Sequence, residues 1–207
     1  MNTNMYESEK FKSKINIANK LTIIRIILVP IFMILILIPI SEIWAKILAA
    51  SVFTLASFTD FLDGMIARKY NLITNFGVLM DPLADKFLVV GALIAITASD
   101  LFLPIRPIVV WVVAVVFFRE LAVTSLRLVA NTSDNNVIAA KFVGKFKTTS
   151  QIICIMTILL EGIVVTNYLN TPEYLFSYIT MAVMSVMTIY SGAIYFKTYG
   201  SYIDPTK

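Results

Sequence analysis

The sequence predicts an all-α integral membrane protein with six transmembrane helices, on the basis of its composition and of the length of its apolar runs. Hydrophobic residues make up 58% of the 207 residues and charged residues only 14%, and the mean hydropathy is +0.84. An ordinary soluble domain is about 45–50% apolar. The apolar residues fall in runs of about 17–25, the length that crosses a hydrocarbon core. Backbone groups in lipid must pair within the segment, so we expect these runs to be helical.

Six apolar segments are predicted to span the bilayer as one membrane domain. Their approximate ranges are 21–40, 44–68, 81–98, 107–130, 144–166 and 174–196. We expect a cytoplasmic or interfacial N-terminal segment over 1–20, the membrane domain over 21–200 and a C-terminal tail over 201–207. Residues 11–21 mix lysines with isoleucines, which favours a short interfacial helix on the anionic inner leaflet. A solvated basic leader is the alternative.

Lysines and arginines are distributed unevenly along the chain. They gather in the N-terminal segment, after the second span, before the fifth span and at the C-terminus, whereas the remaining loops hold little beyond Lys46 and Arg106. The positive-inside rule therefore places both termini and the loops after the second and fourth spans in the cytoplasm. We expect a multi-pass protein of the cell membrane with its active site on the cytoplasmic side.

The chain contains no histidine and a single cysteine, Cys154, which lies within an apolar run. These counts exclude an intramolecular disulfide and a thiolate cluster for zinc. Any general base or metal ligand must therefore come from carboxylates, lysine, tyrosine, the backbone or water. This gives weight to four aspartates that lie beside the second and third spans.

The four aspartates form two pairs with helical spacing. Asp60 and Asp63 are three residues apart, and Asp81 and Asp85 are four apart, so each pair shares one face of a helix. Two adjacent antiparallel helices can direct both pairs at one point. The Asp81-Pro82 dipeptide predicts a helix start, because aspartate caps free N–H groups and proline is tolerated at the first helical position. Capping is therefore the structural alternative for Asp81.

Four ionised carboxylates at one point would repel one another, and a carboxylate in hydrocarbon is costly unless it is paired. Arg68 and Lys86 cannot neutralise all four. Hard cations prefer oxygen ligands, so one or two Mg²⁺ or Mn²⁺ ions are the predicted counter-charge, with ligand positions left for a phosphate-bearing substrate. The structural alternative is a set of solvated loop and cap residues at the ends of the spans.

The spacing of these aspartates and their neighbours resembles the signature of the CDP-alcohol phosphotransferase family. The matching positions are Asp60, Asp63, Gly64, Ala67, Arg68, Gly77, Asp81 and Asp85, eight fixed residues over 26 positions. The resemblance implies an integral membrane enzyme of six helices in which an alcohol displaces CMP from a CDP-linked donor. It also implies a homodimer, and we expect no nucleic-acid partner.

The resemblance also implies roles for single residues. The four aspartates correspond to metal ligands for two ions, and Asp85 corresponds in addition to the catalytic base that removes the proton of the acceptor hydroxyl. Gly64 and Arg68 correspond to contacts with the nucleotide and diphosphate of the donor. A glycine lets a ligand approach the backbone, and an arginine can pair with phosphate. A membrane-surface anchor is the alternative for Arg68.

A second motif lies upstream. Residues 16–30 resemble the opening of one bacterial branch of the family, which adds Asn19 and Thr22 to the implied contacts with the donor. The sequence departs from that opening at Ala18, where proline is common. Thr74 is a further candidate for donor contact, with a plain loop residue as the alternative.

Cations within and beside the fourth and fifth spans indicate which alcohol acts as the acceptor. Arg119, Arg127, Lys141 and Lys145 are the candidates for binding an acceptor phosphate. Arginines inside an apolar run are costly, which favours a function for Arg119 with Glu120 as its partner or orienter. An internal ion pair with snorkelling ends is the alternative.

The pattern around these cations resembles the branch that makes phosphatidylglycerophosphate. The implied reaction is phosphatidyl transfer from CDP-diacylglycerol to sn-glycerol 3-phosphate, with release of CMP, in phospholipid biosynthesis. Within the family the alternatives are transfer to serine, to an inositol phosphate or to phosphatidylglycerol. From a different class, a small cation channel or transporter could also gather intramembrane aspartates.

Overall fold

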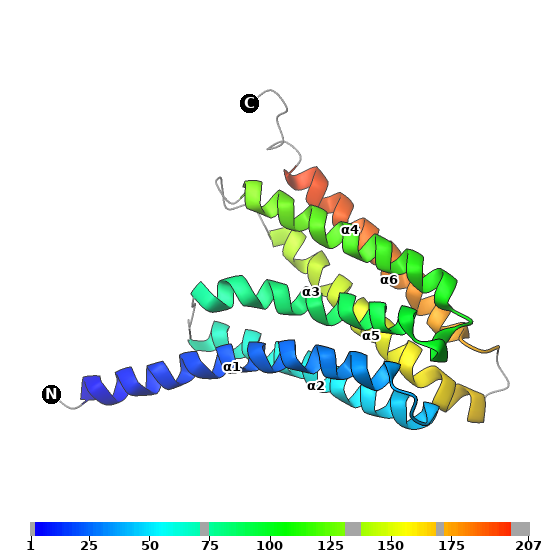
Figure 1. Ribbon diagram of the computed structural model, residues 1–207. Coiled ribbons are helices and arrows are strands. Elements are labelled where there is room, and N and C mark those ends of the chain that lie inside the picture. The colour runs from blue at the N-terminus through cyan, green and yellow to red at the C-terminus, as the bar shows by residue number, and fades with distance from the viewer. Residues whose placement is uncertain (1–2, 71–74, 131–137, 169–171, 200–207) are drawn as a thin grey trace. The chain divides into compact units, whose positions relative to one another are not determined.

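We examined a computed structural model of the chain, which describes residues 3–70, 75–130, 138–168 and 172–199. Side chains are described over 19–66, at 77, and over 79–126, 144–165 and 172–198. The described residues form six α-helices and one short 3₁₀ helix, so the prediction of an all-helical fold is confirmed (Figure 1). The helices are α1 Thr3–Leu37, α2 Glu42–Tyr70, α3 Asn75–Ala98, α4 Arg106–Ala130, α5 Ile138–Tyr168 and α6 Leu175–Tyr199, and the 3₁₀ helix is Asp100–Phe102.

Five of the six helices are long and apolar enough to cross a membrane. The candidate spans are Asn19–Leu37, Glu42–Ile66, Arg106–Leu126, Gly144–Val165 and Leu175–Thr198, within the part of the chain that the structure describes. Helix α3 is the sixth predicted span, and it carries Asp81, Asp85 and Lys86 in its first half. These three charges lie close together within the predicted span and leave residues 87–98 as the longest uncharged run of α3.

Two helix starts differ from the sequence prediction. The short helix expected before the first span is continuous with it, because α1 runs unbroken from Thr3 to Leu37. The expected start of α3 at Asp81-Pro82 is wrong, because α3 already begins at Asn75 and includes Pro82. A proline removes one backbone hydrogen bond and crowds the preceding turn. So close to the start of α3 it does not end the helix, and Asp81 is not a terminal cap.

The chain divides into two compact units, Met1–Ala95 and Ile96–Lys207. In the first unit α1 packs along α2 (Figure 1), and the rings of Phe32 and Phe53 meet there with centroids 5.9 Å apart. Helix α3 approaches α1 at Gly91, where a Cβ atom would lie 2.8 Å from Cγ1 of Val29. Glycine is needed at this position because the two helices are too close for a side chain.

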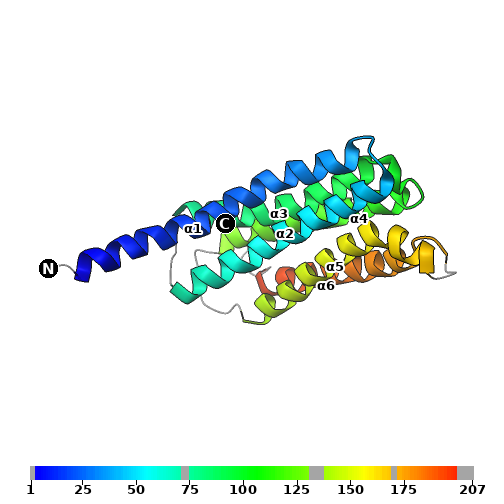
Figure 2. The same cartoon turned by 90° about the horizontal axis from the view of Figure 1, so that it is seen from below.

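In the second unit α6 packs against both α4 and α5, and α5 and α6 run side by side in Figure 2. The buried carboxylate of Glu161 on α5 accepts hydrogen bonds from the backbone N–H groups of Phe176 (2.7 Å) and Ser177 (2.6 Å), and from the Ser177 hydroxyl. These N–H groups belong to the first turn of α6 and have no partner within the helix. Glu161 therefore caps α6 from a neighbouring helix.

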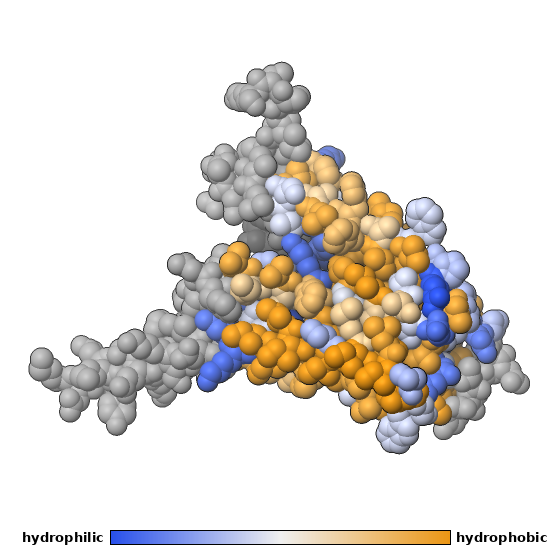
Figure 3. Space-filling view, viewed as in Figure 1, coloured by the Kyte–Doolittle hydropathy of each residue, from blue (hydrophilic) through white to orange (hydrophobic). Residues whose placement is uncertain are grey.

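Large apolar side chains cover much of the surface. On α1 they include Ile23, Ile27, Ile31 and Ile34, each at least 40% exposed, and Figure 3 shows an apolar band where α1 faces the viewer. Soluble monomers rarely expose contiguous apolar patches of this extent. These outward-facing side chains are suited to contact with lipid, as expected for a multi-pass membrane protein.

Candidate functional site

In the first unit the aspartates of α2 and α3 converge on Arg25 of α1. One guanidinium nitrogen of Arg25, Nη1, lies 2.9 Å from Oδ1 of Asp60 and 2.6 Å from Oδ1 of Asp85. The other, Nη2, is paired with Oδ2 of Asp63. Three of the four predicted aspartates therefore share one cation, and they come from two helices as the spacing of the two pairs suggested.

The fourth aspartate, Asp81, is held by the same face of α1. The hydroxyl of Thr22 donates a hydrogen bond of 2.8 Å to Oδ1 of Asp81. Thr22 lies three residues before Arg25 on α1, so the two side chains project from the same side of the helix. Thr22, predicted as a donor contact, is buried, and in this structure it positions a carboxylate.

The sequence analysis missed the central role of Arg25. Its side chain is 0% exposed, and burying an arginine is costly unless its charge is paired. The signal was present in the sequence, since Arg25 lies inside the first apolar span. Arg68 and Lys86, rather than Arg25, were weighed as the counter-charge. The sequence could not reveal that α1 packs beside both aspartate pairs, on α2 and on α3.

The carboxylates differ in their access to solvent. The side chain of Asp63 is 7% exposed, that of Asp60 is 34% exposed and that of Asp85 is 53% exposed. A small molecule can therefore reach Asp85 more easily than Asp63.

The oxygen ligands of these aspartates suit a hard divalent cation. Three carboxylates pair with Arg25 and a fourth with Thr22, which gives an all-oxygen set of ligands of the kind that Mg²⁺ and Mn²⁺ prefer. In the described part of the chain the acidic groups do not form a ready set of three metal ligands. Their oxygens are directed at the Arg25 guanidinium, so metal binding requires some of them to reorient.

Of the other predicted donor contacts, Asn19 on α1 and Gly64 on α2 are half-buried. Gly64 follows Asp63 directly, at the cluster of carboxylates. Arg68 lies in the last turns of α2, with its side chain outside the described residues, and Thr74 lies outside them altogether.

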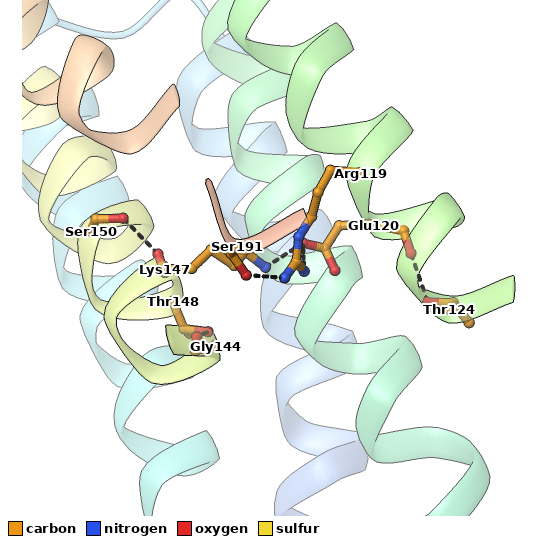
Figure 4. Close-up of polar contacts among 8 residues, drawn as sticks. All are labelled: Arg119, Glu120, Thr124, Gly144, Lys147, Thr148, Ser150 and Ser191. Atoms are coloured by element: carbon orange, nitrogen blue, oxygen red, sulfur yellow. Dashed lines mark hydrogen bonds and ion pairs between the residues drawn. The ribbon is translucent and has the colours of Figure 1, made fainter. Parts of the chain in front are cut away.

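The second unit holds a separate charged network, shown in Figure 4. Oε1 of Glu120 on α4 pairs with Nη1 of Arg119 at 3.2 Å and with Nζ of Lys147 on α5. The other guanidinium nitrogen of Arg119, Nη2, donates a hydrogen bond to the hydroxyl of Ser191 on α6. The side chains of Arg119 and Lys147 are each 10% exposed. Among the described side chains of this network, two cations share one carboxylate, so positive charge exceeds negative charge there.

The predicted acceptor residues are only partly described. Lys145 is exposed on α5, and the side chains of Arg127 and Lys141 lie outside the described residues, although both positions are helical. Glu120 forms an ion pair with Arg119, as one of its two predicted roles, partner or orienter, required. Lys147 joins the network as an ion-pair partner, and Ser191 was not foreseen because a serine in an apolar helix carries no distinctive signal.

The chain is similar in sequence to proteins of one known family. The family model described as CDP-alcohol phosphatidyltransferase matches residues 15–190. A CDP-diacylglycerol–glycerol-3-phosphate 3-phosphatidyltransferase of Bacillus subtilis (strain 168) is 41% identical over 194 residues, which cover 87% of this chain and 93% of that protein.

Two further relatives carry the same name. The protein of Wigglesworthia glossinidia brevipalpis is 36% identical over 148 residues, covering 70% of this chain and 78% of its own length. The protein of Salmonella paratyphi A is 34% identical over 149 residues, covering 70% of this chain and 76% of its own length. The region 15–190 contains all four aspartates and the ion-paired residues Arg119, Glu120 and Lys147. The chain therefore belongs to the CDP-alcohol phosphatidyltransferase family.

Proposed function

We propose that this protein transfers the phosphatidyl group of CDP-diacylglycerol to sn-glycerol 3-phosphate, giving phosphatidylglycerophosphate and CMP. The observation that carries the proposal is the cluster of four aspartates around Arg25 and Thr22 in a membrane protein. The relatives named for this reaction, the first of them 41% identical over most of both chains, support the same acceptor. The donor's acyl chains would remain in the bilayer while its diphosphate meets the carboxylates.

Asp60, Asp63, Asp81 and Asp85 are the proposed ligands for one or two Mg²⁺ or Mn²⁺ ions. When bound, such ions neutralise charge on a diphosphate and on the departing phosphate. The role of Arg25 is to hold three carboxylates together against their mutual repulsion, and that of Thr22 is to orient Asp81. Arg25 and Thr22 thus keep the four carboxylates close together, and some of them would reorient to bind the metal.

Asp85 is the proposed general base. It is the most exposed of the three carboxylates at Arg25, so an acceptor hydroxyl can reach it. The acceptor's primary hydroxyl would lose its proton to Asp85 and attack the donor's phosphoryl group next to diacylglycerol, with CMP as leaving group. Phosphoryl transfer of this kind depends mainly on positioning and on stabilisation of charge.

The remaining residues are proposed to bind the two substrates. Asn19, Thr22, Gly64, Arg68 and Thr74 are proposed contacts for CDP-diacylglycerol, and Arg119, Arg127, Lys141 and Lys145 for the acceptor phosphate. The excess positive charge around Glu120 supports this second assignment, because a neutral acceptor such as serine would not require it.

The cellular setting follows from the same proposal. We expect a homodimer in the cell membrane, with both termini and the active site on the cytoplasmic side, where the water-soluble acceptor is available. The distribution of lysines and arginines supports this orientation. A cation channel is disfavoured by membership in a family of transferases.

A test compares acceptors with the same purified protein. The protein in detergent would receive CDP-diacylglycerol and Mg²⁺ together with glycerol 3-phosphate, serine, inositol phosphate or phosphatidylglycerol, and CMP release would be measured. We expect release with glycerol 3-phosphate alone. Release with a different acceptor would keep the carboxylate cluster as a phosphatidyltransferase site and overturn the proposed acceptor. The absence of release with all four, in protein that remains folded, would overturn the transferase assignment for this chain.

A further inference from the structure

One turn of α6 makes three contacts with the side chain of Arg119. The hydroxyl of Ser191 accepts a hydrogen bond from Nη2, and the ring of Tyr195 lies 5.6 Å from the guanidinium carbon. Gly192 lies against the aliphatic stem, because a Cβ atom at this position would come within 3.3 Å of Cγ of Arg119. Ser191, Gly192 and Tyr195 are all buried. None of these three residues was singled out by the sequence or by the proposed function.

These contacts restrict the guanidinium in different ways. The hydrogen bond to Ser191 and the ion pair with Glu120 fix the two terminal nitrogens, and therefore the plane of the group (Figure 4). The face of Tyr195 favours a cation above it. Gly192 lets the stem lie directly on the α6 backbone, which leaves little space for another rotamer. Arginine otherwise has many rotamers, and ordering it costs up to about 2 kcal/mol of side-chain entropy.

The guanidinium of Arg119 has one N–H group that these contacts do not use. Nε of Arg119 is buried and has no hydrogen-bond partner among the described residues. Nε2 of Gln151, one turn after Lys147 on α5, is also buried without a partner in the described part of the chain. Buried donors are almost always paired in folded proteins, so unpaired ones point to a ligand with acceptor oxygens. A phosphate supplies such oxygens and the negative charge that the network lacks.

We infer that Ser191, Gly192 and Tyr195 are positioning residues that hold Arg119 in the orientation that receives the acceptor's phosphate. The inference rests on the proposed function, since it takes Arg119 as a phosphate contact. Glu120 also positions Lys147 relative to Arg119, because one carboxylate oxygen binds both cations and so fixes their separation. The three residues of α6 act through Arg119, so they set the affinity for the acceptor and leave donor binding unaltered.

The test is the kinetics of Ser191→Ala against a matched serine. Ser185 lies on the same helix, is half-buried and has no side-chain hydrogen bond to the described residues, so Ser185→Ala is the control. Loss of a hydrogen bond to a charged group corresponds to about a tenfold change in binding. We expect Ser191→Ala to raise the KM for glycerol 3-phosphate about tenfold, with the KM for CDP-diacylglycerol and the thermal midpoint unchanged. Ser191→Thr, which keeps the hydroxyl, should restore most of the affinity.

A double variant checks that Ser191 acts through Arg119. Arg119→Lys removes the nitrogen that Ser191 contacts, so Ser191→Ala should add little to the effect of Arg119→Lys. Additive effects would overturn the inference. So would an unchanged KM for glycerol 3-phosphate in Ser191→Ala, or an equal rise in both KM values together with a lower thermal midpoint, which is the signature of a structural role.

The outcome for the wild-type protein separates this inference from the proposed function. If the wild-type protein transfers to glycerol 3-phosphate and Ser191→Ala behaves like Ser185→Ala, only the positioning role is overturned. If the wild-type protein transfers only to an uncharged acceptor, the proposed acceptor is wrong. The positioning role is then overturned as well, because it requires an acceptor phosphate at Arg119.

Discussion

Arg25 and Asp85 stand 60 residues apart in the chain and are joined by a hydrogen bond of 2.6 Å between Nη1 and Oδ1. This bond connects α1 to α3, while the pairing of Arg25 with Asp63 connects α1 to α2. A single buried guanidinium therefore holds together the three helices of the first unit at the place where their carboxylates meet. Helix α1 carries none of the four aspartates and supplies the positive charge that pairs with three of them.

Replacing Arg25 with alanine should destabilise the protein. The change leaves the buried carboxylate of Asp63 without its cation, and breaking a buried ion pair costs about 3–5 kcal/mol. The measurement is thermal unfolding in detergent with chelator present. Arg106→Ala is the control, because its partner Asp100 is 88% exposed and the pair contributes little. Similar unfolding midpoints for the two variants would show that Arg25 is not what holds the carboxylates together.

Asp85→Asn should abolish turnover while leaving a folded, membrane-inserted protein. The amide cannot accept the proton of the acceptor hydroxyl, and loss of a general base lowers rates by about 10²–10⁴-fold. Asp100→Asn, in the exposed pair with Arg106, is the matched control and should retain activity. CMP release and the thermal midpoint would be measured for both variants. Activity near the wild-type level in Asp85→Asn would exclude Asp85 as base.

Removing divalent metal should stop the reaction, and adding Mg²⁺ or Mn²⁺ should restore it. The physical reason is that the four aspartates offer carboxylate oxygens, which hard divalent cations prefer as ligands. Binding can be read without turnover from the electron paramagnetic resonance signal of Mn²⁺. We expect tight binding by the wild-type protein and weaker binding by Asp63→Asn. Full turnover in the presence of excess chelator would contradict the metal requirement.

Gly91→Ala should destabilise the first unit. An added Cβ would lie 2.8 Å from Cγ1 of Val29, and overpacking of this kind typically costs about 1–3 kcal/mol. Alanine is favoured over glycine in a helix by up to about 1 kcal/mol. We expect the cost of the clash to exceed this gain, so the free energy of unfolding should fall. The Val29→Ala change removes the clashing methyl, and the double variant should recover stability relative to Gly91→Ala. Higher stability of Gly91→Ala alone would contradict the close approach of α1 and α3.

The sequence predicted the helices well because hydropathy and length are local properties. The span predicted over 44–68 lies within α2, and the one over 174–196 overlaps nearly all of α6. The start of α3 was wrong because a proline near a helix end is compatible with either a first position or an interior one. Packing against α1 and α2 is not visible in the local sequence.

The site was predictable to the extent that its residues repeat at helical spacing. Asp60 with Asp63, and Asp81 with Asp85, were recognisable as pairs from sequence alone. Arg25, the common partner of Asp60, Asp63 and Asp85, was not, because its contacts join positions up to 60 residues apart. Ser191 and Tyr195 meet Arg119 across a similar separation and are ordinary residues in an apolar helix. Such tertiary contacts depend on how whole helices pack.

Phosphatidyl transfer to glycerol 3-phosphate can be detected by following the acceptor into the lipid product. Purified protein would be given CDP-diacylglycerol, Mg²⁺ and radiolabelled glycerol 3-phosphate, and the lipid extract would be assayed for label and for mass. The account predicts labelled phosphatidylglycerophosphate in a one-to-one ratio with released CMP. CMP release with phosphatidic acid as the lipid product and no label in the lipid would mean hydrolysis of the donor, and would contradict phosphatidyl transfer to glycerol 3-phosphate.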